Sequence, residues 1–198
     1  NLRSVSQAVQ HVARAEDVEV LVTADARAVL DADRVVLPGQ GHMGDCMREI
    51  AASGLLNAVL HAAANKPLFG VCVGMQMLLD RSEEGPTDGL GLIPGEVVRF
   101  QLEGRLQADG SRFKVPQMGW NPVFHDLGRG PSHPLWAHIE DGAYFYFVHS
   151  FYARPSQIGH SVGEADYGGR FAAAIAPDKI FSTPVHPEKS PPPGPAPY

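Results

Sequence analysis

The sequence predicts an α/β fold in which a mostly parallel sheet is flanked by helices and extended by antiparallel strands. In the first half of the chain, short β-branched segments alternate with segments whose apolar residues have helical spacing, which is typical of a parallel sheet wound with helices. In the second half, strand-like segments follow one another between glycines and prolines, which favours antiparallel pairing. The length of 198 residues is enough for one well-buried core. We therefore expect a single domain over residues 1–190.

The first half is expected to open with a helix. Ser4 is followed three residues later by Gln7, the capping-box pattern of a helix start, and valines then recur at helical spacing. Strands are expected at 18–22, 34–37 and 67–71, and helices near 25–30, over 47–60 with a break at 53–54, and over 75–79.

The second half is expected to form the antiparallel part of the sheet. Its strand candidates are residues 97–100, 113–118, 143–148, 161–165, 171–175 and 179–183. The segment 191–198 is rich in proline, which donates no backbone hydrogen bond and cannot continue a helix. We expect this tail to be disordered.

Composition excludes several classes of function. The net charge is −6 and the 16 Lys and Arg residues are dispersed, which argues against a nucleic-acid surface. No apolar run approaches the roughly 18 residues of a membrane span, and no signal peptide is visible at the start. The two cysteines, Cys46 and Cys72, are too few for a disulfide framework or a four-ligand metal site. We expect a cytoplasmic protein without metal or cofactor.

Cys72 lies between Gly70 and Gly74, directly after an apolar run and before a helical segment. This is the setting of a nucleophile elbow, in which a sharp strand-to-helix turn presents the reactive atom. The amides of the following helix would favour a thiolate. The alternative is a small buried cysteine in the core.

His186-Pro187-Glu188 could supply the base for that thiol. Proline restricts His186 to extended conformations, and residues two apart in an extended segment project to the same side. Glu188 would then orient the imidazole of His186, which would act as base and later as acid. Taken alone, the same residues could form a solvated turn.

The glycine-rich segment 39–44 follows a strand and matches the G-x-G-x-x-G pattern of dinucleotide sites. Pro38 interrupts the passage from strand to helix, and residues 59–65 contain no acid for a ribose, so we reject a dinucleotide site. The loop could instead present backbone N–H groups which, with the amide of Val73, would stabilise an oxyanion.

Two further segments are unusual for plain core strands. Residues 114–121 combine a proline, a glycine and Trp120, and composition favours a core position for this tryptophan over an interface. Residues 144–150 form an aromatic strand that ends in His149, which we interpret as a hydrogen-bonded structural histidine.

These motifs together resemble the class I (triad) glutamine amidotransferases, a family with a flavodoxin-like α/β fold. The matching motifs are G-V-C-V-G-M-Q at 70–76, H-P-E-K-S at 186–190 and P-G-Q-G at 38–41. Within this class, K-V-P-Q-M-G-W-N at 114–121 and Y-F-V-H-S-F-Y at 146–152 resemble the glutaminase subunits of imidazole glycerol phosphate synthases. The five motifs span nearly the whole chain in the expected order.

The resemblance implies that Cys72 attacks the carboxamide of glutamine, releases ammonia and forms a thioester, with His186 and Glu188 completing the triad. It implies a (β/α)₈-barrel cyclase partner of histidine biosynthesis, which accepts the ammonia. The implied oxyanion and substrate residues are Gly39, Gln40, Val73, Gln76, His149, Ser150 and Phe151. The implied partner interface consists of Lys114, Gln117, Trp120, Asn121 and Lys189.

The chain departs from the family pattern at both ends. Family members usually begin with an apolar strand and a D-Y-G-x-G-N turn, whereas this chain begins at Asn1, so we expect the first strand to be missing. After the triad motif, the proline-rich segment 191–197 replaces the usual amphipathic helix. Two alternatives follow: a glutaminase that serves another synthase, such as the anthranilate, guanylate or pyridoxal phosphate systems, or a non-catalytic subunit that only docks.

Overall fold

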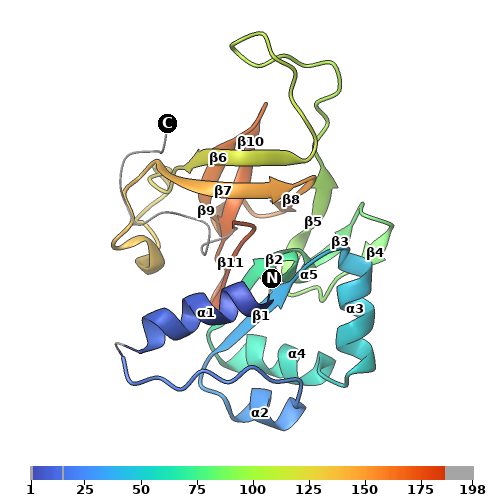
Figure 1. Cartoon of the computed structure of the whole chain (residues 1–198), viewed down its shortest axis with the longest axis vertical. Helices are drawn as coiled ribbons and strands as arrows, with labels where there is room; N and C mark the ends of the chain where they lie inside the picture. Colours follow the sequence, from blue (N-terminus) through green and yellow to red (C-terminus); the bar gives the residue numbers. More distant parts are fainter. Residues whose placement is uncertain (1, 15, 186–198) are drawn as a thin grey trace.

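The computed structural model describes residues 2–14 and 16–185, and Figure 1 shows the arrangement of its elements. The helices are α1 (Leu2–Ala13), α2 (Ala26–Asp31), α3 (Met43–Ala52), α4 (Leu56–Asn65) and α5 (Val73–Met77), with 3₁₀ turns at Pro134–Trp136 and Ile158–His160. The strands are β1 (Val35–Gly39), β2 (Leu68–Cys72), β3 (Leu79–Ser82), β4 (Thr87–Asp88), β5 (Ile93–Arg99), β6 (Gln117–Val123), β7 (Ala143–His149), β8 (Phe151–Pro155), β9 (Ser161–Asp166), β10 (Arg170–Ile175) and β11 (Ile180–Thr183).

Nine of the strands in this part of the chain form one mixed sheet in the order β1-β2-β11-β10-β8-β5-β3-β4, with β9 paired to β10. β2 pairs in parallel with both β1 and β11, and β3 pairs in parallel with β5. The pairs of β10 with β8, β9 and β11 are antiparallel. The expected α/β fold, with an antiparallel extension in the second half, is confirmed. The sheet is mixed rather than mostly parallel, because β3 with β4 and β5 with β8 are antiparallel as well.

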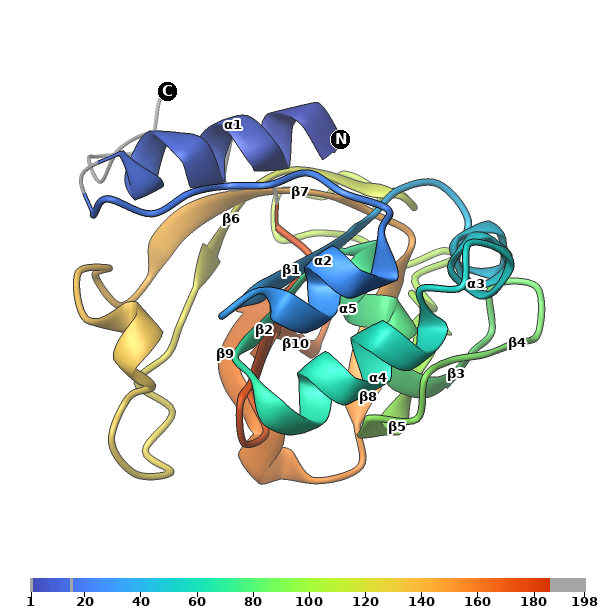
Figure 2. The same ribbon diagram turned by 90° about the horizontal axis from the view of Figure 1, so that it is seen from below.

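Helices cover the parallel part of the sheet on both faces. In Figure 2, α1 lies on one side of β1 and β2, and α4 lies on the other. Val59 and Ala62 of α4 are buried in the same apolar cluster as Leu68 of β2. Asp25 caps α2, since its side chain accepts a hydrogen bond from the N–H of Arg27.

The strands β6 and β7 form a separate two-stranded antiparallel sheet that faces the antiparallel part of the large sheet (Figure 1). A second apolar cluster lies between the two sheets. Val123 and Phe147 of this cluster come from the two-stranded sheet, and Phe171 comes from β10. The molecule therefore has two neighbouring cores, and the chain passes from one sheet to the other between β7 and β8.

The expected strand at 18–22 is wrong. These residues have no regular structure, and the side chains of Val18, Leu21 and Val22 are exposed, Leu21 by 66%. A β-branched composition favours a strand only where a neighbouring strand supplies hydrogen bonds. β1 pairs with β2, and no strand of the described part pairs with residues 18–22.

Other differences concern boundaries. α1 begins before Ser4, so the expected capping box does not start this helix. α5 ends at Met77, and β3, β4 and β8 were not expected. β6 begins at Gln117, four residues later than the expected strand at 113–118. The helix break at 53–54 is confirmed, with Gly54 at φ +75°. The expected tail at 191–198 lies outside the described residues.

Candidate active site

Cys72 is the last residue of β2 and directly precedes α5. Its backbone has φ 58° and ψ −122°, a region that residues with a side chain rarely adopt. Such a conformation costs on the order of 1–3 kcal/mol and persists only where the surrounding structure enforces it. The strand-to-helix setting that the sequence predicts for Cys72 therefore agrees with the structure.

Close backbone packing around Cys72 explains the glycines near it. A Cβ atom at Gly74 would overlap the carbonyl oxygen of Leu37. A Cβ atom at Gly39 would lie 2.8 Å from the nitrogen of Gly74, closer than real Cβ contacts. Gly39 is also the register partner of Cys72 in the parallel β1–β2 ladder. The end of β1 and the turn at Cys72 are thus in direct contact through glycine.

A cavity of about 610 Å³ opens beside this turn. Its lining includes Cys72 and, except for Gly39, all the residues that the resemblance assigns to the oxyanion and substrate site: Gln40, Val73, Gln76, His149, Ser150 and Phe151. Its lining also includes residues that sequence reasoning missed: Ser4, Gly41, Glu84, Pro116, Val148 and Pro184. The topology therefore brings segments that are far apart in the sequence, from Ser4 to Pro184, to one cavity.

Glu84 is the most informative of the missed residues. It is the one carboxylate among the described residues that line the cavity. The side chain is half-buried, and its Oε2 accepts a hydrogen bond of 2.9 Å from the N–H of Met43. No motif surrounds Glu84 in the sequence, and the Glu83-Glu84 pair is an ordinary surface pattern. Its position in the lining of the cavity is what identifies Glu84 as a candidate site residue.

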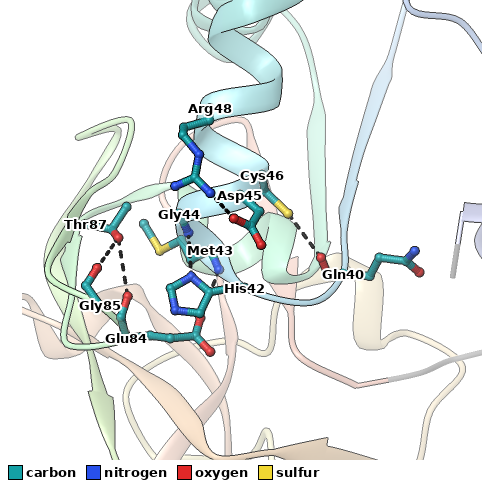
Figure 3. Close-up of polar contacts among 10 residues, drawn as sticks. All are labelled: Gln40, His42, Met43, Gly44, Asp45, Cys46, Arg48, Glu84, Gly85 and Thr87. Atoms are coloured by element: carbon teal, nitrogen blue, oxygen red, sulfur yellow. Dashed lines mark hydrogen bonds and ion pairs between the residues drawn. The ribbon is translucent and has the colours of Figure 1, made fainter.

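The loop after β1 is tied to the start of α3 and to the segment 84–87, as Figure 3 shows. His42 caps α3, because its Nδ1 accepts from the N–H of Gly44. Cys46 lies one turn further along, and its Sγ donates to the carbonyl oxygen of Gln40 at 3.3 Å. Because a trans peptide directs its C=O and N–H to opposite sides, the N–H of Gly41 points away from Cys46. These contacts fix the backbone of the loop that lines the cavity.

Cys46 is partly buried against the first core. Burial raises the pKa of the Cys46 thiol, and the nearby carboxylates of Glu49 and Asp45 act in the same direction. The hydrogen bond to Gln40 opposes this shift. Cys46 is therefore poorly suited to act as a nucleophile near neutral pH.

Gln76, in α5, lines the cavity and has a buried polar atom in its side chain. Its side-chain oxygen Oε1 is buried and has no hydrogen-bond partner among the described residues. An unsatisfied buried acceptor costs about 1–3 kcal/mol, so it is usually explained by a group that binds there. Since Gln76 lines the cavity, a ligand with an N–H donor would satisfy it.

The residues assigned to a partner interface lie in different environments. Lys114 is exposed, and Trp120 is only partly buried on the outer face of β6, where it packs edge-to-face on Tyr146. The core position that composition favours for Trp120 belongs instead to Trp136, which is buried. Asn121 is partly buried, and its side chain donates to the carbonyl oxygen of Asp166 at 2.8 Å.

Gln117 differs from these interface candidates because it is only 3% exposed. This burial leaves its side chain no access to a partner's surface. His186, Glu188 and Lys189 lie outside the described residues. Pro184 lines the cavity, and His186 follows it by two residues in the sequence.

Over residues 2–14 and 16–185, no helix is long and apolar enough to cross a membrane. The same residues include no group of three or more His, Cys, Asp or Glu side chains placed to hold a metal ion.

Comparison with known proteins decides the family. The family model described as "Glutamine amidotransferase class-I" matches residues 1–197. The chain belongs to the class-I glutamine amidotransferase family. It is thus identified as an enzyme of the glutaminase type, and the family membership expected from the sequence motifs is confirmed.

The curated relatives reported below are both subunits of one enzyme within this family. The chain is 51% identical over 190 residues to the imidazole glycerol phosphate synthase subunit HisH of Aromatoleum aromaticum, a match that covers 96% of this chain and 87% of that protein. It is 50% identical over 190 residues to the HisH subunit of Dechloromonas aromatica, with 96% and 85% of the two chains covered.

Solved structures agree on the fold. A glutamine amidotransferase crystal structure superposes with a TM-score of 0.68 at 14% identity, over 95% of this chain and 86% of the other. The glutaminase domain of Trypanosoma brucei CTPS, solved with bound acivicin, gives a TM-score of 0.62 at 16% identity over 93% and 79%. At these identities the likeness concerns the fold alone.

Proposed function

We propose that this chain hydrolyses glutamine to glutamate and ammonia at Cys72 and delivers the ammonia to a cyclase subunit that makes imidazole glycerol phosphate in histidine biosynthesis. The observation that carries the proposal is the strained turn at Cys72 beside a cavity that also holds a carboxylate and a buried unpaired acceptor. The 50–51% identity to two HisH subunits supports this synthase over the other glutamine-dependent synthases considered above.

The cavity offers groups that suit free glutamine. Glutamine carries an α-ammonium, and Glu84 is placed to pair with a cation. Gln76 Oε1 can accept an N–H from the substrate. The volume of about 610 Å³ is of the size found for small-molecule sites.

The chemistry follows from a thiolate at Cys72. Its Sγ attacks the carboxamide carbon of glutamine, and the carbonyl oxygen becomes an oxyanion. Backbone N–H groups near Val73, Gly39 and Gln40 would stabilise this charge. When the C–N bond breaks, the leaving nitrogen takes a proton and departs as ammonia, and a γ-glutamyl thioester remains. Water then attacks the thioester carbon, which releases glutamate and restores the thiol.

His186 and Glu188 would manage the protons of both steps. The imidazole of His186 takes the proton from the thiol, gives it to the leaving nitrogen, and later takes one from water. Glu188 orients that ring and stabilises its charged form. Support for this assignment comes from the H-P-E-K-S motif and from the position of Pro184 at the cavity.

A (β/α)₈-barrel cyclase is the proposed partner, and the outer face of the β6–β7 hairpin is the proposed contact. Three apolar cross-strand pairs lie along this face: Met118 with Val148, Trp120 with Tyr146, and Pro122 with Tyr144. Met118 and Tyr144 are exposed. Aromatic and methionine side chains are enriched in protein interfaces, which fits a docking role for this face. Lys114 and Lys189, which the resemblance assigns to the interface, belong to the same proposed contact.

The test is glutamate release from glutamine, measured with and without the cyclase and its nucleotide substrate. We expect the complex to release glutamate. The rate of release should fall at least about 10³-fold in Cys72→Ala, because the nucleophile is removed. Cys46→Ser is the matched control and should retain most of the activity. A folded complex that releases no glutamate, or a fully active Cys72→Ala variant, would refute the proposal and favour a subunit that only docks.

A further inference from the structure

The junction between the two sheets lies at the wall of the cavity. β7 ends at His149 and β8 begins at Phe151, so Ser150 alone separates a strand of the two-stranded sheet from a strand of the large sheet. All three residues line the cavity beside Cys72. A change of angle between the sheets at this point would therefore change the shape of the cavity.

The ring of His149 is built into this junction by hydrogen bonds on both sides. Its Nδ1 lies 2.8 Å from the carbonyl oxygen of Phe151, and its Nε2 lies 2.9 Å from Oε1 of Gln117. Gln117 is directly opposite His149 in the β6–β7 ladder. His149 is 9% exposed. The imidazole thus connects the hairpin to the backbone of β8.

The partners determine how the ring can be protonated. A carbonyl oxygen only accepts, so Nδ1 must carry a proton and donate it to Phe151. Nε2 then needs a donor if the ring is neutral and an acceptor if the ring is charged. The side-chain amide of Gln117 can supply either a donor or an acceptor. Rotation of the amide exchanges its NH2 group and its oxygen, which extend equally far toward the ring. Gln117 therefore stabilises the ring orientation in which Nδ1 holds Phe151.

Aromatic packing holds the same ring in place from other directions. Phe100 meets it edge-on at 5.1 Å between ring centroids, and Phe147 stacks on it at 5.4 Å. Phe100 also donates its N–H to the carbonyl oxygen of Ser150 at 3.1 Å. The junction is therefore held both at its side chain and at its backbone.

We propose that Gln117 is a positioning residue that acts through His149 to hold the backbone of Ser150 and Phe151 as the wall of the glutamine site. The inference rests on the proposed function for the identity of the ligand. It gives a role to the buried side-chain amide of Gln117, which lies between two exposed residues, Pro116 and Met118. It also links the placement of the hairpin to the affinity for substrate.

The experiment compares Gln117→Met, His149→Phe and the double variant in glutamate release by the complex with the cyclase. Methionine has nearly the length of glutamine, but its side chain has no donor and only a weakly accepting thioether sulfur. We expect KM for glutamine to rise about tenfold in Gln117→Met, the usual consequence of leaving one buried polar group unpaired. kcat should stay within about threefold, because the turn at Cys72 is unchanged. The double variant should be no worse than the more impaired single variant.

Ser161→Ala is the matched control for loss of a buried polar contact. Its hydroxyl donates to Glu164 in β9, away from the cavity. This variant should lose some thermal stability and keep the KM of the parent protein. The inference would be overturned if the effects of Gln117→Met and His149→Phe on KM added in the double variant. An unchanged KM in folded Gln117→Met would also overturn it. If His149→Phe does not fold, Gln117→Glu replaces it, and its KM should stay closer to the parent value than that of Gln117→Met.

Hydrogen exchange separates this inference from the proposed function. The amide of Phe100 reports on the junction, since it donates to Ser150. We expect it to exchange at least about tenfold faster in Gln117→Met, while amides of β2 keep their rates. If the parent protein releases no glutamate, the proposed function fails, and unchanged exchange at Phe100 independently refutes the positioning role.

Discussion

Gly39 and Cys72 face each other at the ends of two parallel strands, and the absence of a side chain at Gly39 allows them to come this close. Gly39 is in register with Cys72, and the space beside it is filled by the backbone of Gly74 and the side chain of Val73. The position of the loop that follows β1 therefore depends on the turn at Cys72.

Gly39→Ala should disturb the turn at Cys72. The added Cβ would lie 2.8 to 3.0 Å from atoms of Val73 and Gly74, so β1 or the turn must shift. Overpacking of this kind costs about 1–3 kcal/mol. We expect a lower melting temperature and at least a tenfold loss of glutaminase activity. Gly159→Ala is the control, because no atom lies within 4 Å of its added Cβ and its φ is ordinary. Equal activity of the two variants would contradict this argument.

Glu84→Gln should weaken binding of glutamine. The change removes the negative charge proposed to pair with the α-ammonium and keeps an oxygen that can accept from Met43. Charge-assisted hydrogen bonds contribute about 1.5–3 kcal/mol, so KM should rise by about ten- to hundredfold. Steady-state kinetics should show the effect mainly in KM. Glu83→Gln is the neighbouring control, because Glu83 is exposed and lies outside the cavity. A similar KM for both variants would remove Glu84 from the site.

Cys46 should resist alkylation near neutral pH. Its folded pKa is raised, mainly by burial, so the reactive thiolate forms only at higher pH than in the unfolded chain. The shift favours the folded state while the thiol is neutral, and this contribution is lost as the pH rises through the unfolded and then the folded pKa. Mass spectrometry after iodoacetamide treatment from pH 6 to pH 10 measures the modification of each cysteine. Rapid labelling of Cys46 at pH 7 in folded protein would show that burial does not control this thiol.

Trp120→Ala should weaken the complex with the cyclase. Trp120 and Tyr146 form an edge-to-face pair on the outer face of the hairpin, with centroids 5.4 Å apart. Removal of an aromatic anchor typically costs about 2 kcal/mol or more of binding free energy, so Kd should rise at least about tenfold. Calorimetric titration with the cyclase measures the change. Leu106→Ala, at an exposed side chain on another segment, serves as the control. Unchanged affinity for Trp120→Ala would place the interface elsewhere.

Local sequence predicted the site best where one short segment contains all the determinants. The glycines around Cys72 and the strand before it are contiguous, so the turn between β2 and α5 could be expected without the fold. The resemblance then supplied Gln40, Gln76 and residues 149–151, all of which line the cavity. Glu84 could not be found in this way, because its role depends on a cavity that other segments form.

Residues 18–22 show the limit of local pattern. Their composition favours a strand, but a strand needs a paired neighbour, and the structure leaves Leu21 and Val22 exposed. Gln117 shows the same limit for side chains. Its motif favours an interface position, yet the β6–β7 register turns its side chain inward to His149.

Short-range backbone preferences and glycine positions encode the α/β class, most helices and strands of the first half, and the sharp turn at Cys72, so these features could be predicted from the sequence. The fold was needed to show which distant residues share the cavity, which face of the β6–β7 pair is exposed, and what the ring of His149 holds. These features depend on strand order and register, and a shift of one residue in register reverses the face of every side chain on a strand.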